Sequence, residues 1–311
     1  MLFGVRKGEP DLSLVLLNPR SCLLKNEILG VSEEFIEQLQ IGRNLVDVFP
    51  TLSHLPKWLQ WWRSRGLRIY NRAVRAYEPI QQDMLRKIED GTAKHCFGRT
   101  INEQRSDLGF SQTEAMFIGL WRTFLNAYVV SSLLEAGSDT TRGTLSGMFA
   151  GALAYPDWPI RARQHLDSVC GDAERLPSFS DVKDLSYIRA VVKECLRWRP
   201  FVDAGMNHMC TEDFEFEGYY FPKGTLFTWN AWAISQNPQE YEDPARFWPE
   251  RYMDEHVENV LHGVWGFGAG RRICAGYPLA ARSLFITISR LLYCFDFEYA
   301  GVRLRQLILF N

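Results

Sequence analysis

The sequence has few cysteines, and none of them forms a metal-binding or disulfide motif. Seven cysteines are scattered over 311 residues, and no two are separated by only two residues. Zinc ribbons, iron–sulfur sites and disulfide frameworks need paired or regularly spaced cysteines, and an odd count leaves one thiol over. The pattern therefore argues against these classes and favours a reducing compartment.

The sequence also lacks an excess of charge of one sign and lacks long apolar runs. It has 35 Lys and Arg against 37 Asp and Glu, a net charge of −2, which gives no sign of a nucleic-acid partner. No apolar run reaches the roughly 18 residues that a membrane-spanning helix needs, so we expect no transmembrane segment in this sequence. Apolar residues (46%) and aromatic residues (14%) are plentiful, which is typical of a globular protein with a large core.

Helical periodicity dominates the chain. The predicted helices cover residues 32–49, 58–91, 115–156, 159–171, 185–200 and 277–295. A different pattern, alternating and rich in aromatic residues, covers residues 214–234 and predicts a hairpin or small sheet with turns at Gly218 and Gly224. No repeat or low-complexity linker interrupts the sequence. We therefore predict a mostly α-helical fold with a minor β part, in a single domain over residues 1–311.

A glycine-rich segment, "WGFGAGRRICAG", holds Cys274. The glycines suggest a phosphate loop, but a dinucleotide fingerprint needs glycine where this sequence has Arg271 or Ile273. Two arginines and a following helix start favour the thiolate form of Cys274. Small neighbours let the backbone approach a flat cofactor, so a haem held by one axial thiolate fits. A buried structural cysteine at a helix cap is the alternative.

The residues around Cys274 carry a resemblance to a known family. They spell F-x-x-G-x-R-x-C-x-G, with the fixed positions Phe267, Gly270, Arg272, Cys274 and Gly276. This pattern resembles the haem-binding signature of the cytochrome P450 family, the haem-thiolate monooxygenases. Three more segments agree with that family, in its order: "EAGSDTTRG", "KECLRWRP" and "FWPERY". The resemblance covers most of the chain and implies the cytochrome P450 fold.

The segment "KECLRWRP" places Glu194 and Arg197 three residues apart on one face of a predicted helix, where they can pair. An ordinary surface pair is the alternative, and it would contribute little to stability. The resemblance implies instead that the pair is buried behind the haem and is completed by Arg251. These three residues would support the cysteine loop. Tyr252 stands where the family's element has Phe.

The segment "EAGSDTTRG" interrupts a long apolar helix with small and polar residues. Gly137 alone weakens a helix by about 1 kcal/mol relative to Ala. One interpretation is that Ser138 or Asp139 caps a new helix. The resemblance implies instead that the helix opens over the haem, and that Asp139 and Thr140 are catalytic residues that deliver protons to the activated oxygen.

The resemblance also assigns the residues that bind the cofactor and the substrate. Cys274 would be the metal ligand, the axial thiolate of the haem iron. Other cofactor contacts would come from Arg272, Phe267, Gly268, His208 and Ala136. Arg272 and His208 would bind the haem propionates, although Met209 stands where the family usually has an arginine. The residues that would line the substrate pocket are Leu133, Phe201, Val202 and Ala204.

The activity implied by the resemblance is NADPH- and O2-dependent monooxygenation of a small lipophilic molecule. We expect the fungal microsomal type, with a role in secondary metabolism. Because the sequence has no nucleotide fingerprint, electrons would come from NADPH through a separate reductase. The expected location is the cytosolic face of the endoplasmic reticulum membrane. Isomerisation without a reductase is a weaker alternative, and the Asp139–Thr140 pair argues against it.

The sequence departs from a full-length member of this family in its extent. We expect the N-terminal region, with its membrane anchor, and the final β segments to be missing. The segment "LWRTFLNA", around residues 121–128, is expected to be extra helix or a retained non-coding segment. Such a chain would lack part of the haem and substrate pocket. The alternative function class is therefore a non-catalytic or haem-deficient remnant of such an enzyme.

The segment "KWLQWWRSRGLR" mixes aromatic and basic residues. Trp58, Trp61 and Trp62 are interspersed with lysine and arginines. This mixture suits contact with a membrane surface. The alternative is a helix with a buried tryptophan face and a solvated basic face.

Overall fold

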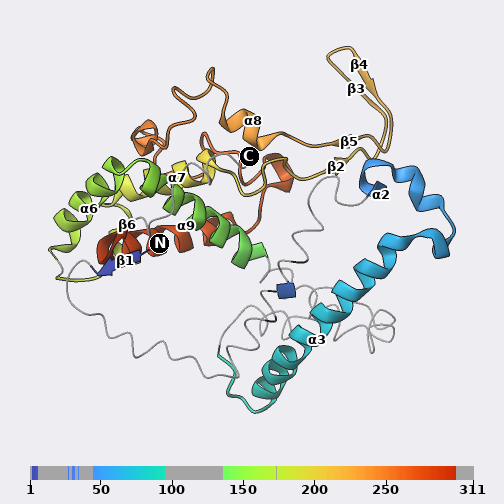
Figure 1. The fold of residues 1–311 in the computed structure, drawn as a ribbon, viewed down its shortest axis with the longest axis horizontal. Coiled ribbons are helices and arrows are strands. Elements are labelled where there is room, and N and C mark those ends of the chain that lie inside the picture. The colour runs from blue at the N-terminus through green and yellow to red at the C-terminus, as the bar shows by residue number, and fades with distance from the viewer. Residues whose placement is uncertain are drawn as a thin grey trace. The chain divides into compact units, whose positions relative to one another are not determined.

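The computed structural model describes residues 2–5, 27, 30, 31, 34, 45–94, 136–172 and 174–298 (Figure 1). Its helices include α2 (Leu45–Val48), α3 (Trp61–Glu89), α6 (Asp157–Cys170), α7 (Ser186–Trp198), α8 (Ala231–Ser235) and α9 (Tyr277–Cys294). Residues 136–154 are also helical. Short 3-10 turns are η2 (Pro50–His54), η3 (Lys57–Leu59), η4 (Phe179–Val182), η5 (Pro249–Tyr252) and η6 (Gly270–Arg272). The predicted mostly helical fold is confirmed.

The chain divides into two compact units. One consists of Met1–Leu12 and Thr140–Asn311, and the other of Ser13–Asp139. The division falls inside the helical segment 136–154. We describe each unit by itself, and the single domain expected over residues 1–311 stays a prediction. The segment around residues 121–128 and Leu133 lie outside the described residues.

Helix α3 is the main element of the unit Ser13–Asp139. It begins at Trp61, three residues later than predicted, because the two prolines of the preceding stretch favour the short turns η2 and η3. It ends at Glu89, where Gly91 adopts a left-handed conformation (φ +68°) and its N–H donates to the Ile88 carbonyl. No helix among the described residues is long and apolar enough to cross a bilayer.

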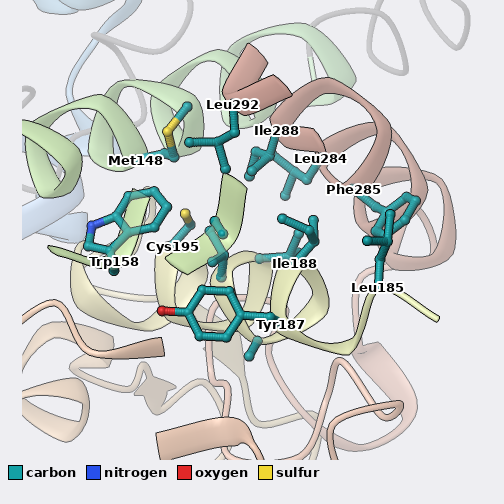
Figure 2. Packing of buried hydrophobic residues seen from close by; sticks show 14 of the residues in the cluster. Met148, Trp158, Leu185, Tyr187, Ile188, Cys195, Leu284, Phe285, Ile288 and Leu292 are labelled. Atoms are coloured by element: carbon teal, nitrogen blue, oxygen red, sulfur yellow. The ribbon is translucent and has the colours of Figure 1, made fainter. Parts of the chain in front are cut away.

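Three helices and the helical residues 140–154 enclose the core of the other unit. Helix α6 contributes one stripe of buried residues at every fourth position: Trp158, Ala162, Leu166 and Cys170. This spacing is the helical period that the sequence shows. Figure 2 shows how Trp158, Ile188 of α7 and Leu292 of α9 point toward a common centre with Met148. The core therefore joins segments separated by more than 100 residues of chain.

Helix α9 is held at its C-terminal end by a side chain of α6. Arg163 donates to the carbonyl oxygens of Leu292 and Phe295, at 3.2 and 3.1 Å, and pairs with Asp296 at 3.0 Å. The last carbonyls of a helix have no partner within the helix, so these bonds satisfy them. The same contact joins α6 to α9 at the point where α9 ends.

In the part of the chain that the structure describes, the β structure consists of three antiparallel pairs. Their strands are β1 (Leu2–Val5) with β6 (Phe295–Glu298), β2 (His208–Met209) with β5 (Leu226–Phe227), and β3 (Phe214–Phe216) with β4 (Tyr219–Phe221). The β3–β4 hairpin turns at Glu217 and Gly218, both with positive φ, as a tight two-residue turn requires. Figure 1 shows this hairpin projecting away from α6, α7 and α9. The small sheet predicted over residues 214–234 is therefore present, whereas β1 and β6 were not predicted.

A buried ionic cluster lies on α7. Glu194 and Arg197 have 0% and 1% of their surface exposed. Arg197 Nε and Nη2 donate to the two carboxylate oxygens of Glu194 at 2.7 and 2.8 Å. The remaining guanidinium hydrogens reach backbone carbonyls of Ser235, Pro244 and Arg246. The interpretation of Glu194 and Arg197 as a surface pair is therefore wrong.

Arg251 completes the cluster. Its Nε lies 3.3 Å from Glu194 Oε2, and its side chain is 7% exposed. Its other nitrogens donate to the carbonyls of Glu242, Asp243 and Arg246. Glu194 also accepts the backbone N–H of Trp248 at 2.7 Å. One buried carboxylate thus holds together α7, the turn η5 and the irregular segment 235–248.

Removing the charge of Arg197 tests this cluster. In Arg197→Met, Glu194 keeps its buried charge but loses its main partner, so we expect the free energy of unfolding to fall by about 3–5 kcal/mol. The control is Glu258→Gln, which breaks the pair of Arg189 with an acid whose side chain is 72% exposed, and it should lower the free energy of unfolding far less. Urea denaturation followed by circular dichroism measures both. Equal costs for the two variants would contradict the account.

Candidate functional site

The cysteine loop, residues 265–276, is shaped by its own backbone hydrogen bonds. The N–H of Gly268 donates to the Trp265 carbonyl at 3.0 Å, and the N–H of Cys274 donates to the Phe267 carbonyl at 2.9 Å. Gly268 and Gly270 have φ of +74° and +66°, a conformation that glycine adopts without strain. The loop therefore folds back so that Cys274 lies beside Phe267.

The thiol of Cys274 is exposed and forms no disulfide. It precedes α9, whose N-cap is Gly276, and the Tyr277 N–H donates to the Cys274 carbonyl at 3.3 Å. A Cβ added to Gly276 would stand 3.7 Å from Cys274 Sγ. The alternative of a buried structural cysteine is therefore wrong. An exposed thiol at the positive end of a long helix is suited to bind a metal as the thiolate.

The ionic cluster reaches the cysteine loop through two tyrosines. Tyr241 and Tyr252 both donate their hydroxyls to the Gly263 carbonyl, at 3.1 and 2.7 Å. Desolvation by burial raises the pKa of both phenols, so they stay protonated and keep donating. The guanidinium of Arg197 lies 5.2 Å from the centre of the Tyr241 ring. The chain is thus fixed just before the loop begins.

The loop also packs directly on α7 and on the core. A Cβ on Gly266 would lie 3.4 Å from the carbonyl oxygen of Leu196, between the two residues of the ion pair. Phe267 packs against the core cluster, and its ring centroid lies 6.1 Å from that of Tyr277. Backbone, core and cluster therefore hold one side of the loop while Cys274 faces outward.

A cavity of about 380 Å³ borders the loop. Its lining comes from two regions of the chain: His208, Trp229 and Ile234 from one, and Trp265, Gly268, Ala269, Arg271 and Arg272 from the other. Three predicted cofactor residues, His208, Gly268 and Arg272, are thereby brought to one place. A guanidinium and an imidazole in one cavity can bind a carboxylate. An exposed thiol on a glycine-rich loop beside such a cavity fits a haem, a flat iron group with two carboxylates.

The residues predicted to be catalytic lie in the helical segment 136–154. Asp139 is 1% exposed, Thr140 is partly buried and Ala136 is exposed. The hydroxyl of Thr144 donates to the Thr140 carbonyl at 2.8 Å, a bond that can bend a helix. Because residues 136 and 137 are already helical, Ser138 and Asp139 are not N-caps, and that interpretation is wrong.

The predicted substrate-lining turn follows α7 and rests on the same helical segment. A Cβ on Gly143 would come within 2.1 Å of Phe201 Cδ2, so only glycine leaves room for that ring. Val202 and Ala204 are half-buried. The hydroxyl of Thr228 donates to the Ala204 carbonyl at 2.6 Å, which ties the turn to the strand before Trp229. The structure thus places Phe201 one helical turn beyond Thr140.

Sequence reasoning missed five residues of the cavity wall, and two tryptophans and an arginine are the largest of them. Trp229, Trp265 and Arg271 line it beside the predicted residues. The signal for Trp229 was its place in the stretch "LFTWNAW", directly after a predicted strand. Arg271 is the neighbour of an arginine that the motif fixes, and Trp265 begins the loop. None of them occupies a fixed position of the motif, so the motif alone could not identify them.

Comparison with known proteins gives an independent result. The sequence model of the family described as Cytochrome P450 matches residues 14–307. Cytochrome P450 monooxygenase fogE of Aspergillus ruber is 37% identical over 263 residues, which are 82% of this chain and 46% of that protein. Cytochrome P450 monooxygenase aneD of Aspergillus aculeatus is 33% identical over 270 residues, 87% of this chain and 49% of that protein.

A third fungal relative matches the chain with similar identity and coverage. Cytochrome P450 monooxygenase fsoB of Humicola fuscoatra is 35% identical over 267 residues, 82% of this chain and 48% of that protein. The chain therefore spans about half the length of the curated relatives it matches. The family model covers almost the whole chain, and the fungal relatives share a third or more of the aligned residues over at least 82% of it. The chain belongs to the cytochrome P450 family.

Proposed function

We propose that this chain carries the haem-thiolate site of a monooxygenase that oxidises a small lipophilic molecule. The observation that carries the proposal is the exposed Cys274 on a loop fixed from behind by the buried Glu194–Arg197–Arg251 cluster. The family implies haem as the cofactor. The similar fungal proteins are named as monooxygenases, which supports the same reaction here.

Each residue of the site has a task in this proposal. Cys274 would hold the iron as its thiolate, and Phe267, Gly268 and Ala136 would contact the cofactor. Arg272 and His208 bind its carboxylates from the cavity wall. When bound, the haem supplies the activation of O2, and electron donation by a thiolate ligand favours O–O cleavage.

The protons and the substrate are handled by a second group of residues. Asp139 and Thr140 deliver protons from a helix in which the carboxyl group is buried. Phe201, Val202 and Ala204 orient the substrate from the turn after α7, and Leu133 is proposed to join them. Electrons come from NADPH through a separate reductase. The apolar character of Phe201 and Val202 suits a lipophilic substrate, and secondary metabolism is the proposed setting.

A carbon monoxide difference spectrum tests the axial ligand. The chain is expressed with added haem precursor and reduced under carbon monoxide, and we expect the band typical of a thiolate-bound haem. The band should vanish in Cys274→Ala, because no other thiol replaces the ligand. The control is Cys210→Ala, which removes a half-buried thiol of the same unit and should leave the band unchanged.

Two results would count against the proposal. A thiolate band that persists in Cys274→Ala would place the ligand elsewhere. A wild-type chain that melts cooperatively but shows no band would instead favour a haem-deficient remnant, the alternative that the extent of the chain leaves open.

We also propose that the segment 57–68 binds a membrane surface, such as the cytosolic face of the endoplasmic reticulum. Trp58 is 81% exposed and Trp61 is 58% exposed, and Leu59 and Leu67 are exposed beside them. Trp61 packs edge-on against Trp62 at 4.7 Å between ring centroids. The basic residues of the same segment are Lys57, Arg63, Arg65 and Arg68. Exposed aromatic and basic side chains together suit the anionic headgroup region.

Vesicle binding tests the membrane proposal. We expect the protein to cosediment with vesicles that contain phosphatidylserine, and the double variant Trp58→Ser/Trp61→Ser to lower the partition coefficient by about tenfold or more. The matched control is Tyr219→Ser/Tyr220→Ser, which removes two equally exposed rings from the β3–β4 hairpin. Equal losses for the two variants, or no dependence on anionic lipid, would show that the segment does not direct binding.

A further inference from the structure

Trp229 lies between β5 and α8, and its ring is held on several sides. A Cβ on Gly268 would stand 3.3 Å from Trp229 Cη2, and a Cβ on Gly205 would stand 2.8 Å from Trp229 Cδ2. The ring centroid also lies 5.8 Å from that of His208, with the planes tilted by 31°. The indole thus joins the cysteine loop, the turn after α7 and the strand that carries His208.

The indole N–H of Trp229 is a buried donor with no acceptor. Its Nε1 atom has no appreciable exposed surface and makes no hydrogen bond to any described residue. A buried polar group without a partner is unfavourable, and such a group marks a place where a ligand can supply the missing acceptor. Because the backbone at Gly205 and Gly268 approaches the ring closely, the indole has little room to turn away and find one.

The charges in the surrounding cavity indicate the kind of acceptor. Arg271 and Arg272 line it together with His208, and none of its lining residues is acidic. Such a wall attracts an anion that accepts several hydrogen bonds. Among the groups of the proposed cofactor, a carboxylate is the best acceptor of this kind. His208 itself is exposed and stands on a strand of only two residues. Its orientation therefore depends on the ring beside it.

We propose that Trp229 is a positioning residue of the carboxylate site: its ring orients the imidazole of His208, and its indole N–H donates to a haem propionate. This inference rests on the proposed function, because it needs haem at Cys274. The motif assigns no role to Trp229. The proposal adds a third donor to the two that the resemblance implies, and it explains why glycines face the indole on two sides.

The test compares haemin with haemin dimethyl ester, in which both propionates are blocked. Trp229→Phe keeps an aromatic ring against His208 but removes the N–H, so the Kd for haemin should rise by about tenfold, as for a lost hydrogen bond to a charged group. The Kd for the dimethyl ester should stay unchanged. Absorbance titration in the same detergent solution measures both. The control is Trp232→Phe, which changes an exposed indole on α8 that does not line the cavity, and it should affect neither ligand.

The proposed orientation of His208 by the ring of Trp229 is tested separately. In the wild-type chain, His208→Ala should raise the Kd for haemin. In a chain that already carries Trp229→Ala, the same substitution should raise the Kd by a smaller factor, because an imidazole without the supporting ring contributes less to haemin binding. Equal factors in both backgrounds would overturn this part. Equal weakening of haemin and its ester by Trp229→Phe would show a packing role only. Failure of the wild-type chain to bind haemin, or binding that ignores Cys274→Ala, would instead overturn the proposed function itself.

Discussion

The guanidinium of Arg197 is the group on which the site depends. It is buried, paired with Glu194 through two short hydrogen bonds, and bonded to carbonyls of a long irregular segment. Irregular backbone leaves carbonyls without partners, and a planar group with five donors can satisfy several of them at once. The same residue packs on Tyr241, whose hydroxyl donates to Gly263. A charge pair on one helix therefore fixes the start of the loop that carries the exposed thiol of Cys274.

In this arrangement, the residues that hold the cysteine loop in place differ from the residues that we propose to bind the cofactor. The cysteine loop has its apolar and backbone contacts on the side of α7 and the core, and Cys274 is exposed. A preorganised ligand loses little conformational freedom when it binds its metal. The cavity beside the loop adds positive charge where we propose that the cofactor's carboxylates bind. The proposed cofactor-binding groups and the residues that support the loop thus come from different segments of the sequence, which meet only in the folded chain.

The sequence predicted the parts of this structure that follow from local pattern. Helices α3, α6, α7 and α9 follow apolar periodicity, and the turn at Gly218 follows from its need for positive φ. The residues of the cysteine motif lie close together because the motif is contiguous in the sequence. The pairing of β1 with β6 was not predictable, because a four-residue strand finds its partner about 290 residues away. The cavity wall at Trp229 depends on contacts between distant segments, which no local spacing encodes.

The most direct test of the central claim leaves the ionic cluster intact and cuts its link to the loop. The double variant Tyr241→Phe/Tyr252→Phe removes both hydroxyls from the Gly263 carbonyl and changes little else. Amide hydrogen exchange, read by mass spectrometry over residues 265–276, should become at least about tenfold faster, since two hydrogen bonds are lost, while α6 and α9 exchange as before. Unchanged exchange in the loop would show that its geometry does not depend on the cluster.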